Sequence, residues 1–415
     1  MHHFEYKNNE LYCEKVRIPE IAEKVGTPFY LYSRQTLVDH YKRLDIAFSG
    51  IDHLICYSIK ANFNLALCKI LREQGCGADI VSGGELYRAL QAGFDPQKIV
   101  YAGVGKTAAE IEYALTSNIL MFNVESMPEA ELLNRIATRL NKKAKIAIRV
   151  NPDVDAHTHD YITTGKKENK FGIDYHDAPE FYRTVKQMPN LEVIGMHIHI
   201  GSQIETPQPY IDSIKRVIEL LHKLRDSGIH ISIFNIGGGM GIVYHKEVPM
   251  PATELAAAIL PLVKDLKCRL LLEPGRYLVG NAGILVTKVL YLKRTHEKTF
   301  IIVDAAITDL IRPSLYDAYH EIQPVLKNVS AKVIEADVVG PVCESGDFFA
   351  HDRKVQEVNS GDLIAIMSTG AYGFAMASNY NCRPRPAEVL VEDATYRVVR
   401  NRETYDDLLK NELTE

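Results

Sequence analysis

The sequence predicts an α/β protein in which a TIM-type (β/α)₈ barrel is joined to a C-terminal all-β domain. Eight short apolar runs with strand character lie between residues 54 and 273, and each but the last is followed by a stretch of helical periodicity. After Arg276 this periodicity largely ends and β-type segments follow. An open doubly wound sheet is the alternative for the first part, but eight strands at similar spacing favour closure into a barrel.

The expected barrel strands fall at residues 54–59, 78–81, 98–102, 119–124, 145–150, 192–200, 232–236 and 269–273. Three strand-to-helix junctions carry a capping box, which satisfies free N–H groups at a helix start: Ser82 with Glu85, Thr107 with Glu110, and Ser126 with Glu129. Residues 30–276 are therefore assigned to the barrel. Residues 1–29 and 277–415 are assigned to the β-rich domain, because the N-terminal strand precedes the barrel. A Lys- and His-rich stretch, 157–170, is expected to be a long loop.

Composition excludes several classes of function. The 415 residues are 46% apolar and 24% charged, and the net charge of -5 offers no field for nucleic acid or anionic lipid. The first residues lack a secretory signal and no apolar run is long enough to span a bilayer, so a cytoplasmic protein without membrane contact is expected. Seven scattered cysteines without a Cys-x-x-Cys pair predict neither disulfides nor structural zinc.

Lys60 ends the first expected strand, in the run Cys56-Tyr57-Ser58-Ile59-Lys60. Barrel enzymes carry their chemistry at the C-terminal ends of their strands. A lysine held there, partly out of water, can supply a neutral amine that condenses with an aldehyde. Taken alone, such a lysine is more often a solvated loop residue.

The sixth expected strand ends in His197-Ile198-His199, followed by Gly201-Ser202. The two histidines share one face and could bind a metal ion, but no third ligand has a suitable spacing, so no metal is expected. An imidazole lying flat against an aromatic ring, next to a Gly-Ser turn that can meet a phosphate, fits this pattern better.

Two turns at the ends of the last strands predict a phosphate site. Gly237-Gly238-Gly239 follows the seventh strand, and its backbone N–H groups can approach an anion closely. It is neither a dinucleotide fingerprint nor a Walker loop. Glu273-Pro274-Gly275-Arg276 ends the eighth strand, and loops after strands seven and eight are the usual phosphate cradle of this barrel.

A strand-end lysine, a glycine-rich cradle and a strand-end carboxylate together predict pyridoxal 5'-phosphate as cofactor. Lys60 would hold it as a Schiff base, and Glu273 would pair with the pyridine nitrogen and keep it protonated. A surface carboxylate at a turn is the simpler explanation of Glu273 when that residue is considered alone.

The chain resembles the fold-type III decarboxylases of basic amino acids, an alanine racemase-like barrel fold, and within them most closely the diaminopimelate decarboxylases. The resemblance runs from about Thr27 to Arg385. It rests on six motifs in the same order: Tyr57-Ser58-Ile59-Lys60-Ala61-Asn62, His197 to Gln203, the triple glycine, Glu273 to Arg276, Cys343-Glu344-Ser345-Gly346-Asp347 and Gly370-Ala371-Tyr372. It departs from the family pattern at Ala305-Ala306, where a glycine is common.

The resemblance implies catalytic and cofactor-binding roles for individual residues. His199 would stack on the cofactor ring, while Cys343 would donate a proton to the α-carbon after CO₂ leaves. The phosphate and ring would be held by Ser202, Gly238, Gly239, Gly275, Arg276 and Tyr372. Cys343 and Glu344 would reach in from a neighbouring subunit, so the resemblance implies a homodimer with shared active sites.

The implied reaction is decarboxylation of meso-2,6-diaminopimelate to L-lysine and CO₂, the last step of lysine biosynthesis. Diaminopimelate carries an ammonium and a carboxylate at both ends, so the enzyme must recognise the end that does not react. Arginine suits the carboxylate and glutamate the ammonium. The expected substrate-binding residues are Arg276, Arg312, Tyr316, Glu344 and Tyr372.

Three other functions remain open from the sequence. A decarboxylase of the same fold could act on arginine, ornithine or carboxynorspermidine, although Arg312 and Glu344 favour diaminopimelate. A non-catalytic protein that binds pyridoxal phosphate would need Lys60, but neither Cys343 nor a second domain. An amino-acid racemase would need a second catalytic base, and Cys343 suits one-way protonation better.

Overall fold

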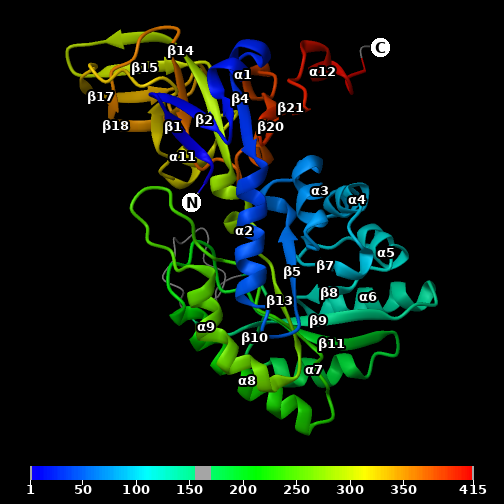
Figure 1. Cartoon of the computed structure of the whole chain (residues 1–415). Helices are drawn as coiled ribbons and strands as arrows, with labels where there is room; N and C mark the ends of the chain where they lie inside the picture. The colour runs from blue at the N-terminus through cyan, green and yellow to red at the C-terminus, as the bar shows by residue number, and fades with distance from the viewer. Residues whose placement is uncertain (1, 155–169, 414–415) are drawn as a thin grey trace. The chain divides into compact units, whose positions relative to one another are not determined.

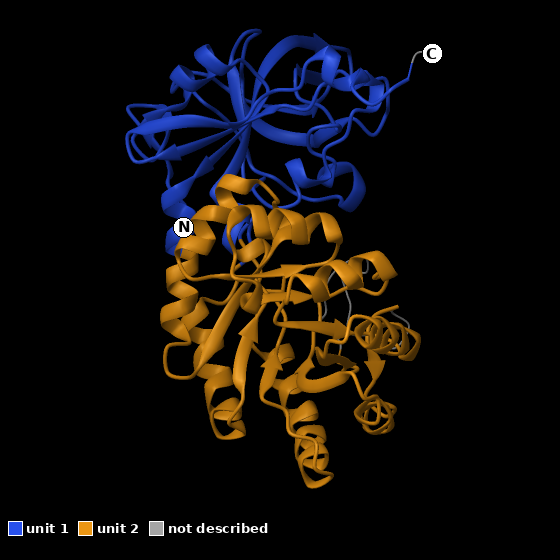
Figure 2. Cartoon of the chain, turned by 90° about the vertical axis from the view of Figure 1, so that its right-hand side faces the viewer, with its two compact units in different colours: residues 1–39, 243–247, 278–415 blue, residues 40–242, 248–277 orange. Residues whose placement is uncertain are grey.

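The computed structural model describes residues 2–154 and 170–413, which form two compact units (Figure 2). The barrel unit comprises residues 40–242 and 248–277, and the sheet unit comprises residues 1–39, 243–247 and 278–415. The loop expected over 157–170 lies, except for Lys170, outside the described residues. The first boundary falls inside α2 (Arg34–Ala47), whereas the sequence placed it at residue 30.

Eight parallel strands close into a barrel within the described part of the chain, as predicted (Figure 1). Closure comes from β5 (His53–Ser58), which pairs with β13 (Arg269–Leu272) on one side and with β6 (Gly77–Ile80) on the other. The strands between them follow in chain order: β7 (Ile99–Tyr101), β8 (Met121–Val124), β9 (Ala144–Asn151), β11 (Leu191–His197) and β12 (Ile233–Asn235). The short β10 (Ile173–Asp174) adds to β9 from outside this circuit.

Helices follow the first seven barrel strands: α3 (Leu65–Glu73), α4 (Gly83–Ala92), α5 (Ala108–Thr116), α6 (Met127–Arg139), α7 (Ala178–Lys186), α8 (Gln208–Asp226) and α9 (Ala252–Val263). The expected caps form at three of them. Ser82 and Ser126 accept hydrogen bonds from the third helical N–H, and Thr107 forms a full capping box with Glu110. The boxes predicted at Ser82 and Ser126 are incomplete, because neither glutamate bonds the cap residue: Glu85 accepts from the Val81 N–H, and Glu129 accepts from the Glu125 N–H and the buried Lys106 amine.

The inside of the barrel changes from apolar to polar along its axis. An apolar layer fills the barrel and includes Leu54, Cys56, Val100, Met121 and Leu271. Buried polar side chains lie further along the same strands, at their C-terminal ends: Asp79, Asn123, Asn235 and Glu273. Burying such groups is costly unless they bind one another or a ligand. This end of the barrel therefore carries the candidate site.

The sheet unit contains a three-stranded sheet and a larger mixed sheet. The first is β1 (Phe4–Lys7), β2 (Glu10–Cys13) and β3 (Val16–Arg17). The second is built from β4 (Phe29–Ser33), β14 (Gly283–Arg294), β15 (Thr299–Val303), β16 (Ile322–Pro324), β17 (Val333–Val339), β18 (Phe348–Gln356), β19 (Leu363–Ile366), β20 (Ala387–Glu392) and β21 (Thr395–Arg400). The helices are α1 (Ile18–Val25), α10 at the boundary (Arg276–Val279), α11 (Arg312–Tyr316) and α12 (Tyr405–Leu409).

The N-terminal segment joins the larger sheet through β4. This strand pairs antiparallel with β14 and parallel with β20, and all five of its residues are buried. Phe29 and Leu31 pack with Ile284, Val286 and Val389 in one apolar cluster. The first residues of the chain therefore belong to the same folding unit as its last third.

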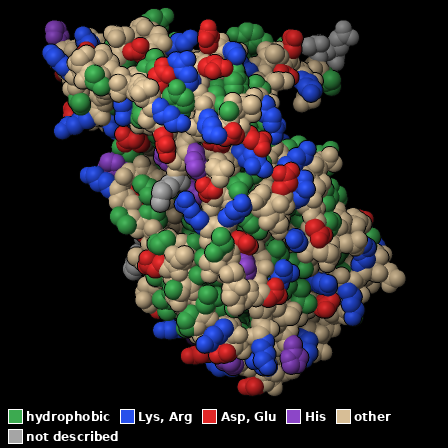
Figure 3. All heavy atoms as spheres, in the orientation of Figure 1, with side chains coloured by type: hydrophobic (Ala, Val, Ile, Leu, Met, Phe, Trp, Pro, Cys, Tyr) green, Lys and Arg blue, Asp and Glu red, His purple; other side chains and the backbone are tan. Residues whose placement is uncertain are grey.

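Charges of both signs are interspersed over the visible face of the molecule (Figure 3). This pattern agrees with the small net charge of -5. In the described ranges no helix combines the length and the apolar character that crossing a bilayer requires.

Asp309 makes the stability of the sheet unit depend on pH. The residue is 3% exposed, and burial raises its pKa from 3.8 to about 7 although the Ala306 N–H donates to the carboxylate. The native state therefore holds a proton that the unfolded chain releases near pH 4. The contribution of this group to the free energy of unfolding is full below that pH and is lost as the pH rises to about 7.

We expect Asp309→Asn to remove this dependence, because the amide oxygen still accepts from Ala306 and carries no charge. The stability of the variant relative to wild type should rise by a few kcal/mol, at about 1.4 kcal/mol per pKa unit, as the pH increases through this window. Urea unfolding at several pH values measures the difference, with the exposed Asp317→Asn as control. A constant difference between Asp309→Asn and wild type would contradict the expectation.

Candidate active site

Lys60 follows β5 in a short 3₁₀ turn, Ile59–Ala61. Its Nζ lies 3.2 Å from Asp79 Oδ2, and the lysine side chain is 41% exposed while Asp79 is fully buried. The Ser58 hydroxyl donates to the same Asp79 oxygen at 2.6 Å. Burial raises the pKa of Asp79 to about 6, opposed by the nearby Lys60 charge. The amine is thus held at the barrel mouth by an anchor on the neighbouring strand β6.

Glu273 is the buried carboxylate at the end of β13, and three side chains surround it. Asn235 donates to Oε1 at 2.6 Å and Asn123 donates to the same oxygen at 3.1 Å. His197 Nε2 lies 3.2 Å from Oε2. Burial alone would raise the pKa of Glu273, but His197, Lys60 and the Asn235 hydrogen bond outweigh it and hold the pKa well below its usual range. Glu273 is therefore an anion in the barrel interior.

His199 lies two residues beyond His197 and differs from it in environment. Its Nδ1 accepts a hydrogen bond from the Gly238 N–H at 3.3 Å. Burial, together with the charges of Arg149 and Lys60, keeps the pKa of His199 well below its ordinary value. The ring is thus neutral, as a ring that stacks on an aromatic ligand should be. His197 instead pairs with Glu273.

The loop after β12 forms a cradle of glycines. A Cβ at Gly238 would lie 2.1 Å from the Glu273 carbonyl oxygen, and Gly239 has a φ of +108°, so neither position accepts another residue without movement of the backbone. Within the described residues, the N–H groups of Gly239 and Met240 donate to no protein acceptor. Two free N–H groups in sequence form a site for an anion.

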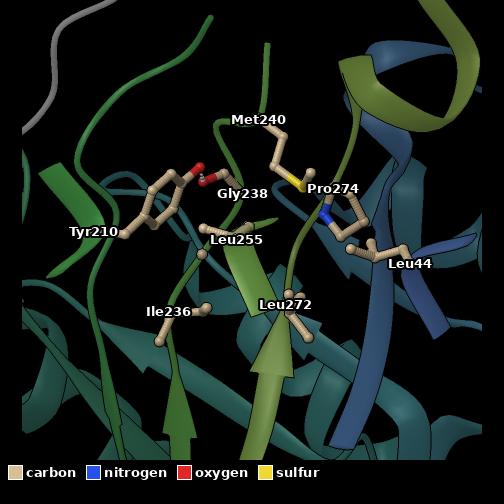
Figure 4. Close-up of a pocket in the computed structure, with 9 residues that line it drawn as sticks. Leu44, Tyr210, Ile236, Gly238, Met240, Leu255, Leu272 and Pro274 are labelled. Carbon is tan, nitrogen blue, oxygen red and sulfur yellow. Dashed lines mark hydrogen bonds between the residues drawn. The ribbon is translucent and has the colours of Figure 1, made fainter. Parts of the chain in front are cut away.

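Figure 4 shows how the outer side of this loop is supported. The Tyr210 hydroxyl, from α8, donates to the Gly238 carbonyl at 2.9 Å. A small, mainly apolar pocket lies behind the loop and is lined by Leu44, Tyr210, Ile236, Gly237, Gly238, Met240, Leu255, Leu272 and Pro274. Apolar packing and one hydrogen bond therefore fix the conformation of the loop from behind.

Ser202 and Arg276 complete the anion site. The Arg276 guanidinium, 8% exposed, donates to Ser202 Oγ at 3.1 Å. Arg276 begins α10. The preceding residue, Gly275, packs against the turn that carries Lys60, because a Cβ at Gly275 would lie only 3.2 Å from Ala61 Cβ. The phosphate cradle and the lysine turn are thus in direct contact.

These residues fit pyridoxal phosphate. The glycine loop, Ser202 and Arg276 offer free N–H groups, a hydroxyl and a cation to a phosphate. The amine of Lys60 can reach an aldehyde, and an anionic Glu273 suits a protonated pyridine nitrogen. Lys60 and Glu273 are close enough for the lysine charge to lower the pKa of the carboxyl. The barrel unit therefore brings together the expected Lys60, His199, Ser202, Gly238, Gly239, Glu273, Gly275 and Arg276.

The remaining predicted residues lie in the sheet unit. Arg312 and Tyr316 are the first and last residues of α11, where Arg312 is buried and Tyr316 is half-buried. Cys343 and Glu344 are exposed on a turn that Asp347 organises, because its carboxylate accepts from the N–H groups of Val342 and Ile307, both at 2.6 Å.

Tyr372 is half-buried and has a φ of +57°. This left-handed conformation is uncommon for a tyrosine and such residues often occur at functional sites. Ala305 and Ala306, where the sequence departs from the family pattern, are fully buried and have no positive φ. The alanines therefore fit the turn before α11 without backbone strain.

Several residues of this site were missed by the sequence analysis. Asp79, Asn123 and Asn235 hold the two charged groups, and Tyr210 holds the glycine loop. One signal was present: each of the first three is a polar residue within an otherwise apolar barrel strand. Tyr210 gives no such signal, because a tyrosine on a helix face is ordinarily a core residue.

Comparisons with known proteins agree with this geometry. Residues 34–280 match the family described as pyridoxal-dependent decarboxylase, pyridoxal binding domain. A diaminopimelate decarboxylase from Aquifex aeolicus is 51% identical over 412 residues, which cover 99% of this chain and 97% of the relative. The chain belongs to the diaminopimelate decarboxylase family. It is accordingly a pyridoxal-phosphate-dependent carboxy-lyase, and the predicted enzyme class and cofactor are confirmed.

Solved structures of this family share the fold. Diaminopimelate decarboxylase from Helicobacter pylori, complexed with L-lysine, is 44% identical with a TM-score of 0.91, covering 94% of this chain and 98% of that chain. The enzyme from M. jannaschii, also with L-lysine, is 38% identical with a TM-score of 0.94, covering 99% of this chain and 98% of that chain. The predicted barrel with a sheet-rich second part is thus the fold of the family.

Proposed function

We propose that this protein decarboxylates meso-2,6-diaminopimelate at its D-centre to L-lysine and CO₂, the last step of lysine biosynthesis. The observation that carries the proposal is the pairing of a strand-end amine with a buried anion at one barrel mouth: Lys60 beside Asp79, and Glu273 with its three partners. The substrate follows from relatives of 44% to 51% identity named for this reaction.

Pyridoxal phosphate, when bound, supplies a ring that accepts the electron pair left on the substrate α-carbon as CO₂ departs. Lys60 binds the cofactor through its amine, and Asp79 positions that amine. Glu273 keeps a proton on the pyridine nitrogen, since a buried anion stabilises the cation opposite it. His199 would cover one face of the ring, and the Gly238-Gly239 loop would bind the phosphate together with Ser202, Gly275 and Arg276.

We assign substrate selectivity to the residues that bind the end of diaminopimelate that does not react. Arg312, with Arg276 and Tyr316, binds the distal carboxylate, while Glu344 binds the distal ammonium. Tyr372 would contact the cofactor and the substrate. An analogue without the distal carboxylate cannot form the charge-assisted hydrogen bonds with Arg312, and such a loss costs a site built for the group much of its affinity.

Cys343 and Glu344 are exposed in the single chain, which suits residues that complete the site of a second subunit. We therefore include a homodimer with shared active sites in the proposal. Cys343 is assigned the proton donor to the α-carbon, because a thiol group can act as a general acid.

The direct test is a CO₂-release assay on purified holoenzyme with diaminopimelate, lysine, ornithine and arginine. Diaminopimelate should be the preferred substrate, with L-lysine formed in equal amount to CO₂. The visible spectrum of the protein should show covalently bound cofactor. Preference for ornithine or arginine would replace the proposed substrate with that of another decarboxylase of this fold.

Replacement of Arg312 should impair substrate recognition more than chemistry. Arg312→Leu removes charge-assisted hydrogen bonds to a carboxylate, so kcat/KM for diaminopimelate should fall by about 10- to 100-fold, mostly through KM. Steady-state kinetics with diaminopimelate measure this change, and the exposed Arg139→Leu is the matched control. An unchanged kcat/KM would remove Arg312 from the recognition site.

Replacement of Cys343 should slow protonation. Cys343→Ser keeps the size of the side chain but exchanges the thiol for a much weaker acid, so kcat should fall by about 10²-fold, at the lower end for loss of a general acid. Steady-state kinetics measure kcat, and Cys382→Ser, at the other exposed free cysteine of the described chain, is the control. Equal rates in both variants would assign the proton to another group.

A further inference from the structure

The Arg312 guanidinium is held on two sides by groups of its own unit. His320 Nε2 lies 3.0 Å from Arg312 Nη1, and both residues are buried, with exposed fractions of 0% and 6%. The Tyr244 ring lies under the guanidinium, 4.7 Å from its carbon to the ring centroid. The same ring meets His320 edge-on at 5.3 Å. The three side chains therefore form one packed cluster.

The contacts of His320 determine which form of the imidazole occupies this cluster. Its Nδ1 lies 2.8 Å from the Met367 carbonyl oxygen, which can only accept, so Nδ1 carries the proton. Arginine can only donate, so Nε2 facing Arg312 must be the unprotonated acceptor. A neutral imidazole with one fixed tautomer satisfies both contacts. A doubly protonated ring would turn an N–H toward the guanidinium.

The backbone of His320 is fixed as well. Its carbonyl oxygen accepts from Arg353 Nη1 at 2.8 Å, and the Met367 N–H donates to the carbonyl of the next residue, Glu321, at 2.8 Å. His320 is thus attached to β18 through Arg353 and to the end of β19 through Met367. A hydrogen bond to such an anchor restricts the arginine side chain, so less conformational entropy is lost when a ligand binds.

We propose that His320 is a positioning residue for substrate selectivity: it orients Arg312 so that the guanidinium binds the carboxylate at the unreacted end of diaminopimelate. A neutral acceptor suits this task because it fixes the guanidinium by a hydrogen bond without neutralising its positive charge. Tyr244 supplies the flat surface on which the guanidinium rests. The inference rests on the proposed function, from which it takes the ligand of Arg312.

Two ligands that differ in one carboxylate distinguish a misoriented Arg312 from general damage to the site. L-Lysine keeps the unreacted end of diaminopimelate, with its ammonium and carboxylate. 1,5-Diaminopentane has the same carbon chain and both amines but lacks the carboxylate. A misoriented arginine should weaken the binding of L-lysine only. A defect in folding or in cofactor binding should weaken the binding of both ligands.

Two substitutions of His320 each keep one of its side-chain hydrogen bonds and remove the other. The amide of His320→Gln reaches the Nε2 position and can still accept from Arg312. The shorter side chain of His320→Asn reaches only the Nδ1 position and can still donate to Met367, but it loses the acceptor for Arg312. Binding of L-lysine and 1,5-diaminopentane to the wild-type, His320→Asn, His320→Gln and Arg312→Leu holoenzymes is measured by calorimetry.

We expect His320→Asn to bind L-lysine about 10- to 100-fold more weakly, since a hydrogen bond to a charged group is lost, and to bind the diamine as wild type does. His320→Gln should recover most of the affinity for L-lysine. Wild-type affinity in His320→Asn, together with a loss in Arg312→Leu, would overturn the inference. Wild-type affinity in Arg312→Leu as well would instead contradict the proposed role of Arg312.

The melting temperature and the cofactor spectrum show whether His320→Asn folds. If it does not fold, Tyr244→Leu is tested instead. This variant removes the ring that packs on both Arg312 and His320. Weaker binding of L-lysine with unchanged binding of the diamine supports the inference. Equal changes for both ligands, or none for either, overturn it.

Discussion

Lys60→Ala should abolish catalysis and the visible absorbance of covalently bound cofactor. The variant loses the only group proposed to bond the cofactor aldehyde, and it loses the amine that Asp79 positions at 3.2 Å. We expect kcat to fall by at least about 10⁴-fold, the upper end for removal of a single proton-transfer group. CO₂ release from diaminopimelate and the absorption spectrum measure the two effects separately.

The control for Lys60→Ala is Lys145→Ala, an exposed lysine near the start of barrel strand β9. That variant should keep the spectrum and rate of wild type. In Lys60→Ala itself, cofactor should still bind without a covalent bond, because the glycine loop, Ser202 and Arg276 remain. Normal CO₂ release by Lys60→Ala would refute the assignment of the active site.

The barrel could be predicted because its signals are local. Alternating apolar strands and three capping boxes lie within short windows of sequence, and the observed strands agree with the expected ranges. The unit boundary is a different kind of feature. β4 joins the sheet of β14 and β20, whose residues follow some 250 to 360 positions later, and no local pattern specifies a partner so distant.

The charged groups of the site could be predicted, but not the residues that hold them. Lys60 and Glu273 stand at strand ends, where the barrel concentrates chemistry. Asn123 reaches Glu273 from a strand 150 residues earlier, so the contact exists only once the barrel is closed. His197 is a related case. Its alternation with His199 places both histidines on one face of the strand, and only the folded chain separates their roles by placing His197 beside Glu273.

Glu273→Gln should leave the fold intact and remove the charge on which the chemistry depends. The glutamine oxygen can still accept from Asn235 and Asn123, which donate to Oε1 at 2.6 and 3.1 Å. Its amide nitrogen replaces the oxygen that faces His197, so an N–H stands where an anion was. A neutral amide does not stabilise a protonated pyridine nitrogen, and the ring becomes a weaker electron acceptor.

We expect kcat for Glu273→Gln to fall by about 10³-fold with a small change in KM, because the lost interaction is strongest when negative charge develops on the substrate. Turnover with diaminopimelate gives the rate, and the pH dependence of the cofactor spectrum reports the loss of ring protonation. Glu192→Gln, exposed on strand β11, is the control for a neutralised glutamate in the barrel. A wild-type kcat in Glu273→Gln would show that the reaction proceeds without an anion at the pyridine nitrogen. A lower kcat with an unchanged spectrum would mean that Glu273 acts on the substrate and not on the cofactor ring.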